Sequence, residues 1–248
     1  MVPKMPVKRR LTDTVIYLGM ALLAALAAGC TGGKSHAAPR PLASLVIVRV
    51  APPKVAVTPK PAEERPAQAG PEILPRSSWA LKDPIEPRLE PMGQVTRITI
   101  HHEGMDVQDE GSATAVKDEL RRIQQSHEDR LHAGDIGYHY IIDYNGRIWE
   151  GRPLKYQGAH AGNGDANRGN IGVALMGNFE YQRPTRAQLD SLATLLKYLA
   201  HKHSVPVGHI YTHREIRKLY DIGYTACPGK YLQQQVDLMR KVLASAER

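Results

Sequence analysis

The strongest constraint on the fold is a nearly uninterrupted apolar run at residues 171–176, with the sequence IGVALM. A strand whose side chains are apolar on both faces belongs at the centre of a sheet that is covered on both sides. The run therefore predicts a central strand, and the rest of the chain has to supply the helices that cover it.

The segments before this run have the patterns of a strand, a helix and a hairpin. Residues 95–102 predict a strand, and residues 113–127 predict a helix. Residues 138–143 and 147–150 predict a hairpin, because the Asn-Gly pair between them is a strong turn signal. The helix carries apolar residues at helical spacing, namely Val116, Leu120 and Ile123.

Two helices are predicted after the run, with a strand between them. Thr185 and Gln188 predict a capping box at the start of the first helix, and the second covers about residues 228–245. Their predicted buried residues are Leu189, Leu192, Leu196 and Leu199 in the first, and Leu232, Val236, Met239 and Leu243 in the second. This order predicts an α/β fold, a mixed central β-sheet covered by helices, in a single domain at residues 71–248.

The first part of the chain predicts export and a lipid anchor. Four basic residues precede an apolar stretch at residues 15–28, and LAAGC at residues 26–30 resembles a bacterial lipoprotein cleavage box. We expect residues 1–29 to be a lipoprotein signal peptide and Cys30 to carry the lipid. Ala27 lies where Leu is commonest in such boxes, and ordinary signal cleavage is the alternative.

Residues 30–70 are rich in Ala and Pro and predict a tether. A flexible chain of this length averages ~35 Å end to end, and an extended one approaches ~120 Å. The domain would then be held in the cell envelope outside the cytoplasm, on the periplasmic side of the outer membrane in a Gram-negative cell, within reach of the wall. An apolar segment at residues 45–50 has no predicted partner.

Net charge and cysteine content exclude few classes of function. The formal net charge is +8, and four of the basic residues lie in the signal segment, so the remaining charge is mild. It suits either the acidic polymers of an envelope or an ordinary solvated surface, and nothing resembles a nucleic-acid module. The two cysteines, Cys30 and Cys227, could form a disulfide in an exported protein. We favour separate roles, because one lies in the tether and the other in a motif.

Histidines and a late cysteine predict a zinc site. His101 and His102 end a predicted strand, His213 lies in THRE at residues 212–215, and Cys227 lies in TACPG at residues 225–229. Zinc binds imidazole and thiolate, and a catalytic zinc keeps three protein ligands and leaves a fourth position for water. The competing interpretation is that these residues never meet.

Two details of this prediction depend on local structure. Strand alternation lets only one of His101 and His102 face the metal, and it does not select which, since both faces of a central strand can be apolar. Pro228 suits the first turn of a helix, which would place the Cys227 sulfur near the positive end of that helix and favour a thiolate.

An ordered series of motifs resembles one known family, the zinc-dependent N-acetylmuramoyl-L-alanine amidases that include the amidase-type phage lysozymes and the peptidoglycan recognition proteins. The resemblance covers roughly residue 71 to the C-terminus. Its motifs are PRSSW at residues 75–79, ITIHH at 98–102, IGYHY at 136–140, GAHAGN at 158–163, NIGVALMGNF at 170–179, and the His213 and Cys227 motifs.

The resemblance implies zinc ligands at His101, His213 and Cys227, with His102 supporting them or lying in the core. It implies a catalytic tyrosine at Tyr138 and a polar residue near the oxyanion at Thr225, where the phage enzymes have lysine and catalytic recognition proteins have threonine. It also places His160 and Asn163 on the wall of the substrate groove. His160 has an alternative interpretation as an ordinary loop residue.

The implied activity is hydrolysis of the amide that joins the lactyl group of N-acetylmuramic acid to L-alanine of the stem peptide. We expect Zn²⁺ as the cofactor, peptidoglycan or muropeptides as the substrate, a membrane partner through the lipid, and a monomer. The alternatives are a non-catalytic peptidoglycan-binding module and a zinc peptidase that acts within the stem peptide. The proton donor to the leaving amine is not identified, and Glu103, His102 and Glu215 are near the ligands in sequence only.

Overall fold

The structure is a computed structural model that describes residues 70–105 and 111–246. The signal segment, Cys30, nearly all of the tether and the apolar segment at residues 45–50 lie outside the described residues. Among the described helices, none is both long enough and apolar enough to cross a membrane.

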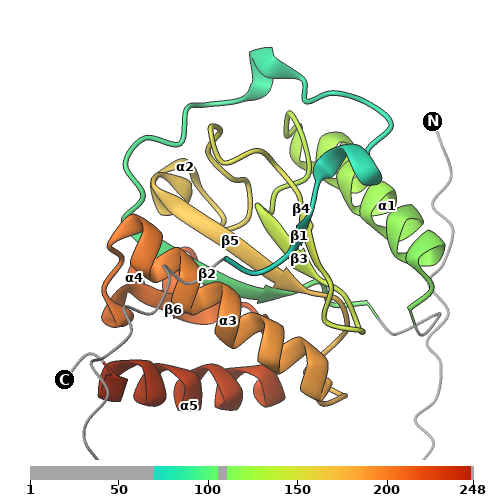
Figure 1. Cartoon of the computed structure of the whole chain (residues 1–248). Coiled ribbons are helices and arrows are strands. Elements are labelled where there is room, and N and C mark those ends of the chain that lie inside the picture. Colours follow the sequence, from blue (N-terminus) through green and yellow to red (C-terminus); the bar gives the residue numbers. More distant parts are fainter. Residues whose placement is uncertain (1–69, 106–110, 247–248) are drawn as a thin grey trace, which may run out of the picture. The chain divides into compact units, whose positions relative to one another are not determined.

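A six-stranded mixed sheet forms the centre of the domain (Figure 1). The strand order is β1-β4-β3-β5-β2-β6, and each pair of neighbours is parallel except β3 with β4. The strands are β1 (Ile73–Leu74), β2 (Arg97–His102), β3 (Tyr140–Ile142), β4 (Ile148–Glu150), β5 (Asn170–Leu175) and β6 (Ile210–Thr212). The predicted α/β class with a mixed sheet is therefore confirmed.

The predicted hairpin is formed by β3 and β4, and its turn follows from local chemistry. Ile142 pairs with Ile148, and Gly146 has φ +80°, which favours glycine. The Asp143 carboxylate accepts hydrogen bonds from the backbone N–H groups of Asn145 and Arg147, both at 3.0 Å. These bonds give the backbone N–H groups of the turn their partners, and β4 then pairs in register with β3.

Helices cover both faces of the sheet, as Figure 1 shows. Apolar residues of α1 (Ala113–Leu131) pack on one face with Ile141 and Trp149. α3 (Arg186–His203) and α5 (Lys230–Ala246) pack on the other face, against Ile98, Ile100 and the β5 residues Ile171, Val173 and Leu175. The short helix α2 (Gly164–Asn167) lies in the connection that leads into β5, and α4 (His213–Leu219) follows β6 directly.

The predicted helices are confirmed, with different boundaries. Thr185 and Gln188 form both bonds of the capping box of α3. The last helix begins at Lys230 rather than near residue 228. Leu189, Met239 and Leu243 are only partly buried at the edge of the core, whereas Leu195, which was not predicted to be buried, is fully buried.

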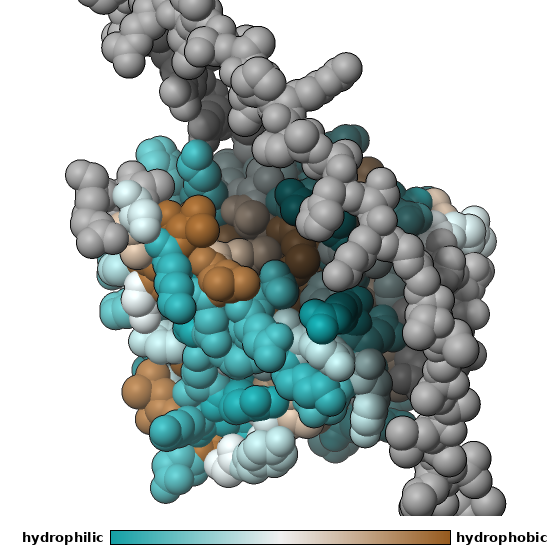
Figure 2. All heavy atoms as spheres, turned by 90° about the horizontal axis from the view of Figure 1, so that it is seen from below, coloured by the Kyte–Doolittle hydropathy of each residue, from teal (hydrophilic) through white to brown (hydrophobic). Residues whose placement is uncertain are grey.

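The outer surface on the side of α5 is largely hydrophilic, with apolar side chains in one larger area and a smaller one (Figure 2). On α5 itself, Leu238 and Val242 are 53% and 69% exposed. The polar surface and the buried apolar stripe together explain why α5 lies as an outer layer on the sheet.

Candidate metal centre and active site

The three predicted zinc ligands converge at one edge of the sheet. β2 and β6 are parallel, and Ile100 pairs with Thr212, so His101 and His213 follow directly at neighbouring positions. Their ring centroids lie 4.5 Å apart. The Cys227 sulfur lies 3.8 Å from Nδ1 of His101. One ligand atom from each of the three residues lies within 4.8 Å of the others.

The sheet determines which histidine of the pair faces the other two. Ile98 and Ile100 point toward α3 and α5, so His102 has their parity and His101 points to the opposite face. His102 nevertheless contributes through its main chain, since its N–H donates to the Cys227 sulfur at 3.3 Å. Its Nδ1 accepts from the N–H of Phe179 at 3.2 Å.

His160 lies beneath His101 and fixes its tautomer. Nε2 of His160 donates to the Asn170 carbonyl at 3.1 Å, because a carbonyl can only accept. Nδ1 of His160 is then an acceptor, and Nε2 of His101 donates to it at 3.0 Å. The lone pair of His101 is consequently on Nδ1, the nitrogen nearest the Cys227 sulfur. Ligating histidines usually have such a partner on the other ring nitrogen.

His160, which the sequence predicts on the groove wall, lies beneath the surface in the structure. Its side chain is buried, with 7% exposed, and both ring nitrogens are bonded inside the protein. The sequence signal for this position is Gly172 in the middle of β5, where a Cβ would lie 2.5 Å from the His160 ring. A glycine in a strand often marks such a close approach.

The chemistry of this donor set fits zinc. Nε2 of His213 is buried and has no hydrogen-bond partner among the described residues. Burial lowers the pKa of His101 well below its usual range and that of His213 to about 4, so both imidazoles are neutral near pH 7, as metal ligands must be. Two imidazoles and one thiol match a catalytic zinc site with one position left for water.

The cysteine is held differently from the sequence prediction. The Cys227 sulfur lies before α5, which begins three residues later at Lys230, and the Lys230 N–H donates to Glu180 instead. Burial raises the pKa of the Cys227 thiol to about 12. A bound cation would favour the thiolate form of Cys227.

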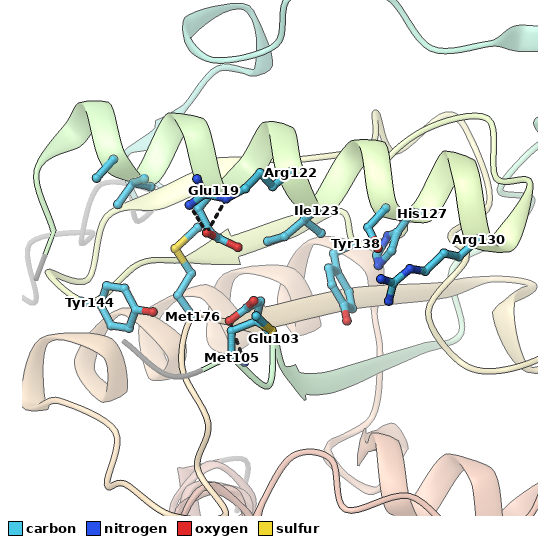
Figure 3. Close-up of a pocket in the computed structure, with 13 residues that line it drawn as sticks. Glu103, Met105, Glu119, Arg122, Ile123, His127, Arg130, Tyr138, Tyr144 and Met176 are labelled. Atoms are coloured by element: carbon cyan, nitrogen blue, oxygen red, sulfur yellow. Dashed lines mark hydrogen bonds and ion pairs between the residues drawn. The ribbon is translucent and has the colours of Figure 1, made fainter. Parts of the chain in front are cut away.

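Tyr138 projects into a cavity of about 610 Å³ beside this cluster (Figure 3). Its ring centroid lies 5.2 Å from that of His101 and 5.4 Å from that of His127. Burial raises the pKa of the Tyr138 hydroxyl, which keeps it protonated as a hydrogen-bond donor. The cavity is lined by Glu103, Met105, Ala115, Val116, Glu119, Arg122, Ile123, Ser126, His127, Arg130, Tyr138, Tyr144 and Met176.

Glu103, His102 and Glu215 lie near the ligands in sequence, and of these three Glu103 lines the cavity (Figure 3). Burial raises its pKa to about 7, and its carboxylate accepts from the N–H of Met105 at 3.1 Å. Glu215 instead pairs with Arg240 at 2.8 Å, and His102 bonds with Phe179. The sequence shows only that Glu103 follows the ligand His101 by two residues, and the cavity that Glu103 lines is formed by the fold.

The structure places Thr225 and Asn163 at exposed or partly exposed positions. Oγ1 of Thr225 accepts from the Cys227 N–H at 3.2 Å, which leaves the hydroxyl proton free to donate. Oδ1 of Asn163 caps α2 by accepting from the Ala166 N–H at 2.8 Å, a bond that does not use the amide NH₂ of Asn163. Both residues keep a donor available for a ligand.

The domain is a mixed α/β domain in which two histidines at the ends of parallel strands meet a cysteine from the loop before α5. Comparison with known proteins identifies the family that has this arrangement. The family model of the N-acetylmuramoyl-L-alanine amidases, Amidase_2, matches residues 91–230. This match spans more than half of the chain, so the chain belongs to the N-acetylmuramoyl-L-alanine amidase family.

Individual relatives agree with the family. One peptidoglycan-recognition protein of Drosophila simulans is 33% identical over 178 residues, which cover 66% of this chain and 85% of that protein. The amidase LysC from Clostridium intestinale is 26% identical with a TM-score of 0.52, covering 66% and 95%. A mutant of Drosophila PGRP-LB in complex with tracheal cytotoxin is 27% identical with a TM-score of 0.55, covering 64% and 89%.

Proposed function

We propose that the protein is a zinc-dependent amidase that hydrolyses the bond between the lactyl group of N-acetylmuramic acid and L-alanine of the stem peptide. The observation that carries the proposal is the complete ligand set of His101, His213 and Cys227 beside Tyr138. Family membership supports a peptidoglycan substrate. Related recognition proteins bind tracheal cytotoxin, a monomeric diaminopimelic acid-type peptidoglycan.

The residues of this chain have separate parts in the proposed reaction. Zinc held by the three ligands would act as a Lewis acid and would lower the pKa of a water bound to it to ~7. Tyr138 donates a hydrogen bond to the oxygen that becomes negative as the amide carbonyl is attacked. Thr225 has a free hydroxyl proton for the same oxygen.

The cavity supplies room for the stem peptide. Its volume of about 610 Å³ lies within the ~300–1,000 Å³ usual for ligand sites. The exposed amide of Asn163 would bind the substrate from the loop that precedes β5. His160, being buried, would support the zinc ligand rather than touch the substrate.

Mass analysis of the products tests the activity directly. The purified protein, loaded with zinc, is incubated with peptidoglycan, and the expected products are a lactyl carboxylate on the glycan and free peptides that begin with L-alanine. Cleavage inside the stem peptide would show a peptidase instead. Metal binding without release of any peptide would show a non-catalytic binding module.

Two substitutions separate metal binding from catalysis. Cys227→Ser should lower zinc affinity and activity together, because it removes the thiolate ligand. Tyr138→Phe should leave zinc affinity unchanged and lower kcat by ~10²–10³, the usual cost of losing one oxyanion donor. Cys30→Ser and Tyr144→Phe are the matched controls, since Tyr144 lines the same cavity away from the ligands. Full activity in both test variants would refute the site.

We further propose that Cys30 carries a lipid that holds the domain outside the cytoplasm. The support is the cleavage box at residues 26–30 and the tether after it. Labelled palmitate should be incorporated by cells that express the chain and not by cells that express Cys30→Ser. An unlabelled but shortened protein would show ordinary signal cleavage.

A further inference from the structure

The zinc ligand His213 depends on a short helix for its position. It is the first residue of α4, which has only seven residues. A helix of this length is marginal by itself, so its position has to come from contacts with the rest of the protein. The N-cap Thr212 and Glu215 make a capping box, in which the Thr212 N–H donates to Oε2 of Glu215 at 2.8 Å.

The carboxylate of this capping box is held from α5. Arg240 donates to both oxygens of Glu215, each at 2.8 Å, which is the bidentate geometry of a strong arginine–carboxylate pair. The pair is partly buried, with 23% of the Arg240 side chain and 33% of the Glu215 side chain exposed. Unlike a fully exposed ion pair, it therefore keeps a fixed geometry.

Two α5 residues, Arg240 and Gln233, also hold the strand that leads into α4. Arg240 donates to the carbonyl of Ile210, the first residue of β6, at 3.0 Å. Gln233 donates to Oε1 of Glu215 at 3.1 Å and accepts from the Thr212 hydroxyl at 2.8 Å. Polar contacts from α5 thus reach both ends of β6 and the first turn of α4.

We propose that Arg240 is a positioning residue for the metal centre, acting through Glu215 to fix the first turn of α4 and with it His213. The inference rests on the proposed function only in taking His213 as a zinc ligand. Nε2 of His213 has no hydrogen-bond partner among the described residues that would hold the ring in place. The position of the ring therefore depends on the start of α4, and a small displacement there would change the geometry of the three donor atoms. Residues that orient a ligand typically account for ~10–100-fold in metal affinity.

Zinc affinity of the full chain tests the proposal, measured by competition with a chromophoric chelator. Arg240→Met should weaken zinc binding by about tenfold and change the visible absorption of the cobalt-substituted protein. Arg240→Lys keeps the charge but not the bidentate geometry and should fall between Arg240→Met and wild type. The matched control is Arg186→Met, which removes an exposed arginine–aspartate pair from α3 and should match wild type.

A purely structural role for Arg240 would lower thermal stability and leave the cobalt spectrum and zinc affinity of the folded protein unchanged. Affinities of Arg240→Met and Arg240→Lys within twofold of wild type would overturn the proposal. If Arg240→Met does not fold, Arg240→Lys and Gln233→Leu decide by the same two measurements. A wild-type protein that binds zinc but releases no peptide would refute the amidase, and the affinity comparison would still decide the role of Arg240.

Discussion

His127 provides a test of the site through the dependence of stability on pH. Its Nδ1 accepts a hydrogen bond from the N–H of Gly137 at 2.7 Å, directly before Tyr138, and its ring packs edge-on against the Tyr138 ring. Burial, and secondarily the charge of Arg152, lowers the pKa of His127 from 6.5 to about 4. The folded protein therefore holds His127 neutral where the unfolded chain would protonate it.

The sign and size of the effect follow from these two pKa values. Below pH 6.5 the unfolded chain binds a proton that the folded state rejects, so the folded state loses stability as the pH falls, until the folded pKa near 4 is reached. One pKa unit corresponds to about 1.4 kcal/mol, so the loss between pH 8 and pH 5 is about 2 kcal/mol. Asn at this position can accept from Gly137 and does not titrate.

Urea unfolding of the metal-free protein at pH 8 and pH 5 measures this loss. His127→Asn should lose about 2 kcal/mol less than wild type between the two pH values, a difference of about 1 M in the relative midpoints. His201→Asn, on an exposed position of α3, is the matched control and should behave as wild type. If His127→Asn loses as much stability as wild type, the His127 ring is not held neutral by the fold.

Two further substitutions address the metal centre. His160→Ala removes the acceptor of the His101 Nε2–H and should weaken zinc binding by about 10–100-fold in a chelator competition, and an unchanged affinity would show that His160 does not set the tautomer. Thr225→Val should lower kcat in the peptide-release assay without changing zinc affinity, because it removes one donor near the oxyanion, and an unchanged kcat would exclude that role.

Local sequence signals predicted the long elements well. The capping box of Thr185 and Gln188 marks the start of α3, and the apolar run marks β5 with a shift of one residue. β1 and α2 were not predicted, since two and four residues are too few to show a period. The end of α1 was placed too early because it ends on His132 in a left-handed conformation, without the usual glycine.

Local patterns alone give the site only as a set of residue types, and the ordered series of motifs is what predicts His101, His213 and Cys227 as one ligand set. His101 and His213 lie together because β2 and β6, more than 100 residues apart in sequence, pair in parallel, and Cys227 reaches them from the loop before α5. No local pattern contains these contacts. The burial of His160 depends on the missing side chain of Gly172 across the fold. Likewise, Glu215 and Arg240 belong to different helices and meet only after β6 has joined the sheet.

Core packing, rather than metal chemistry, decides which histidine of β2 is available to the metal. Ile98 and Ile100 are fully buried against the layer of α3 and α5, and β2 is paired on both sides with β5 and β6. A slip of one residue would turn both isoleucines to the other face and replace His101 with His102. The slip would put Thr99 and His101 into the apolar layer of α3 and α5 without their present partners Asn170 and His160, and burying an unpaired polar group costs about 1–3 kcal/mol. His101 is therefore selected before any metal binds, and zinc would meet a ligand that the sheet has already oriented.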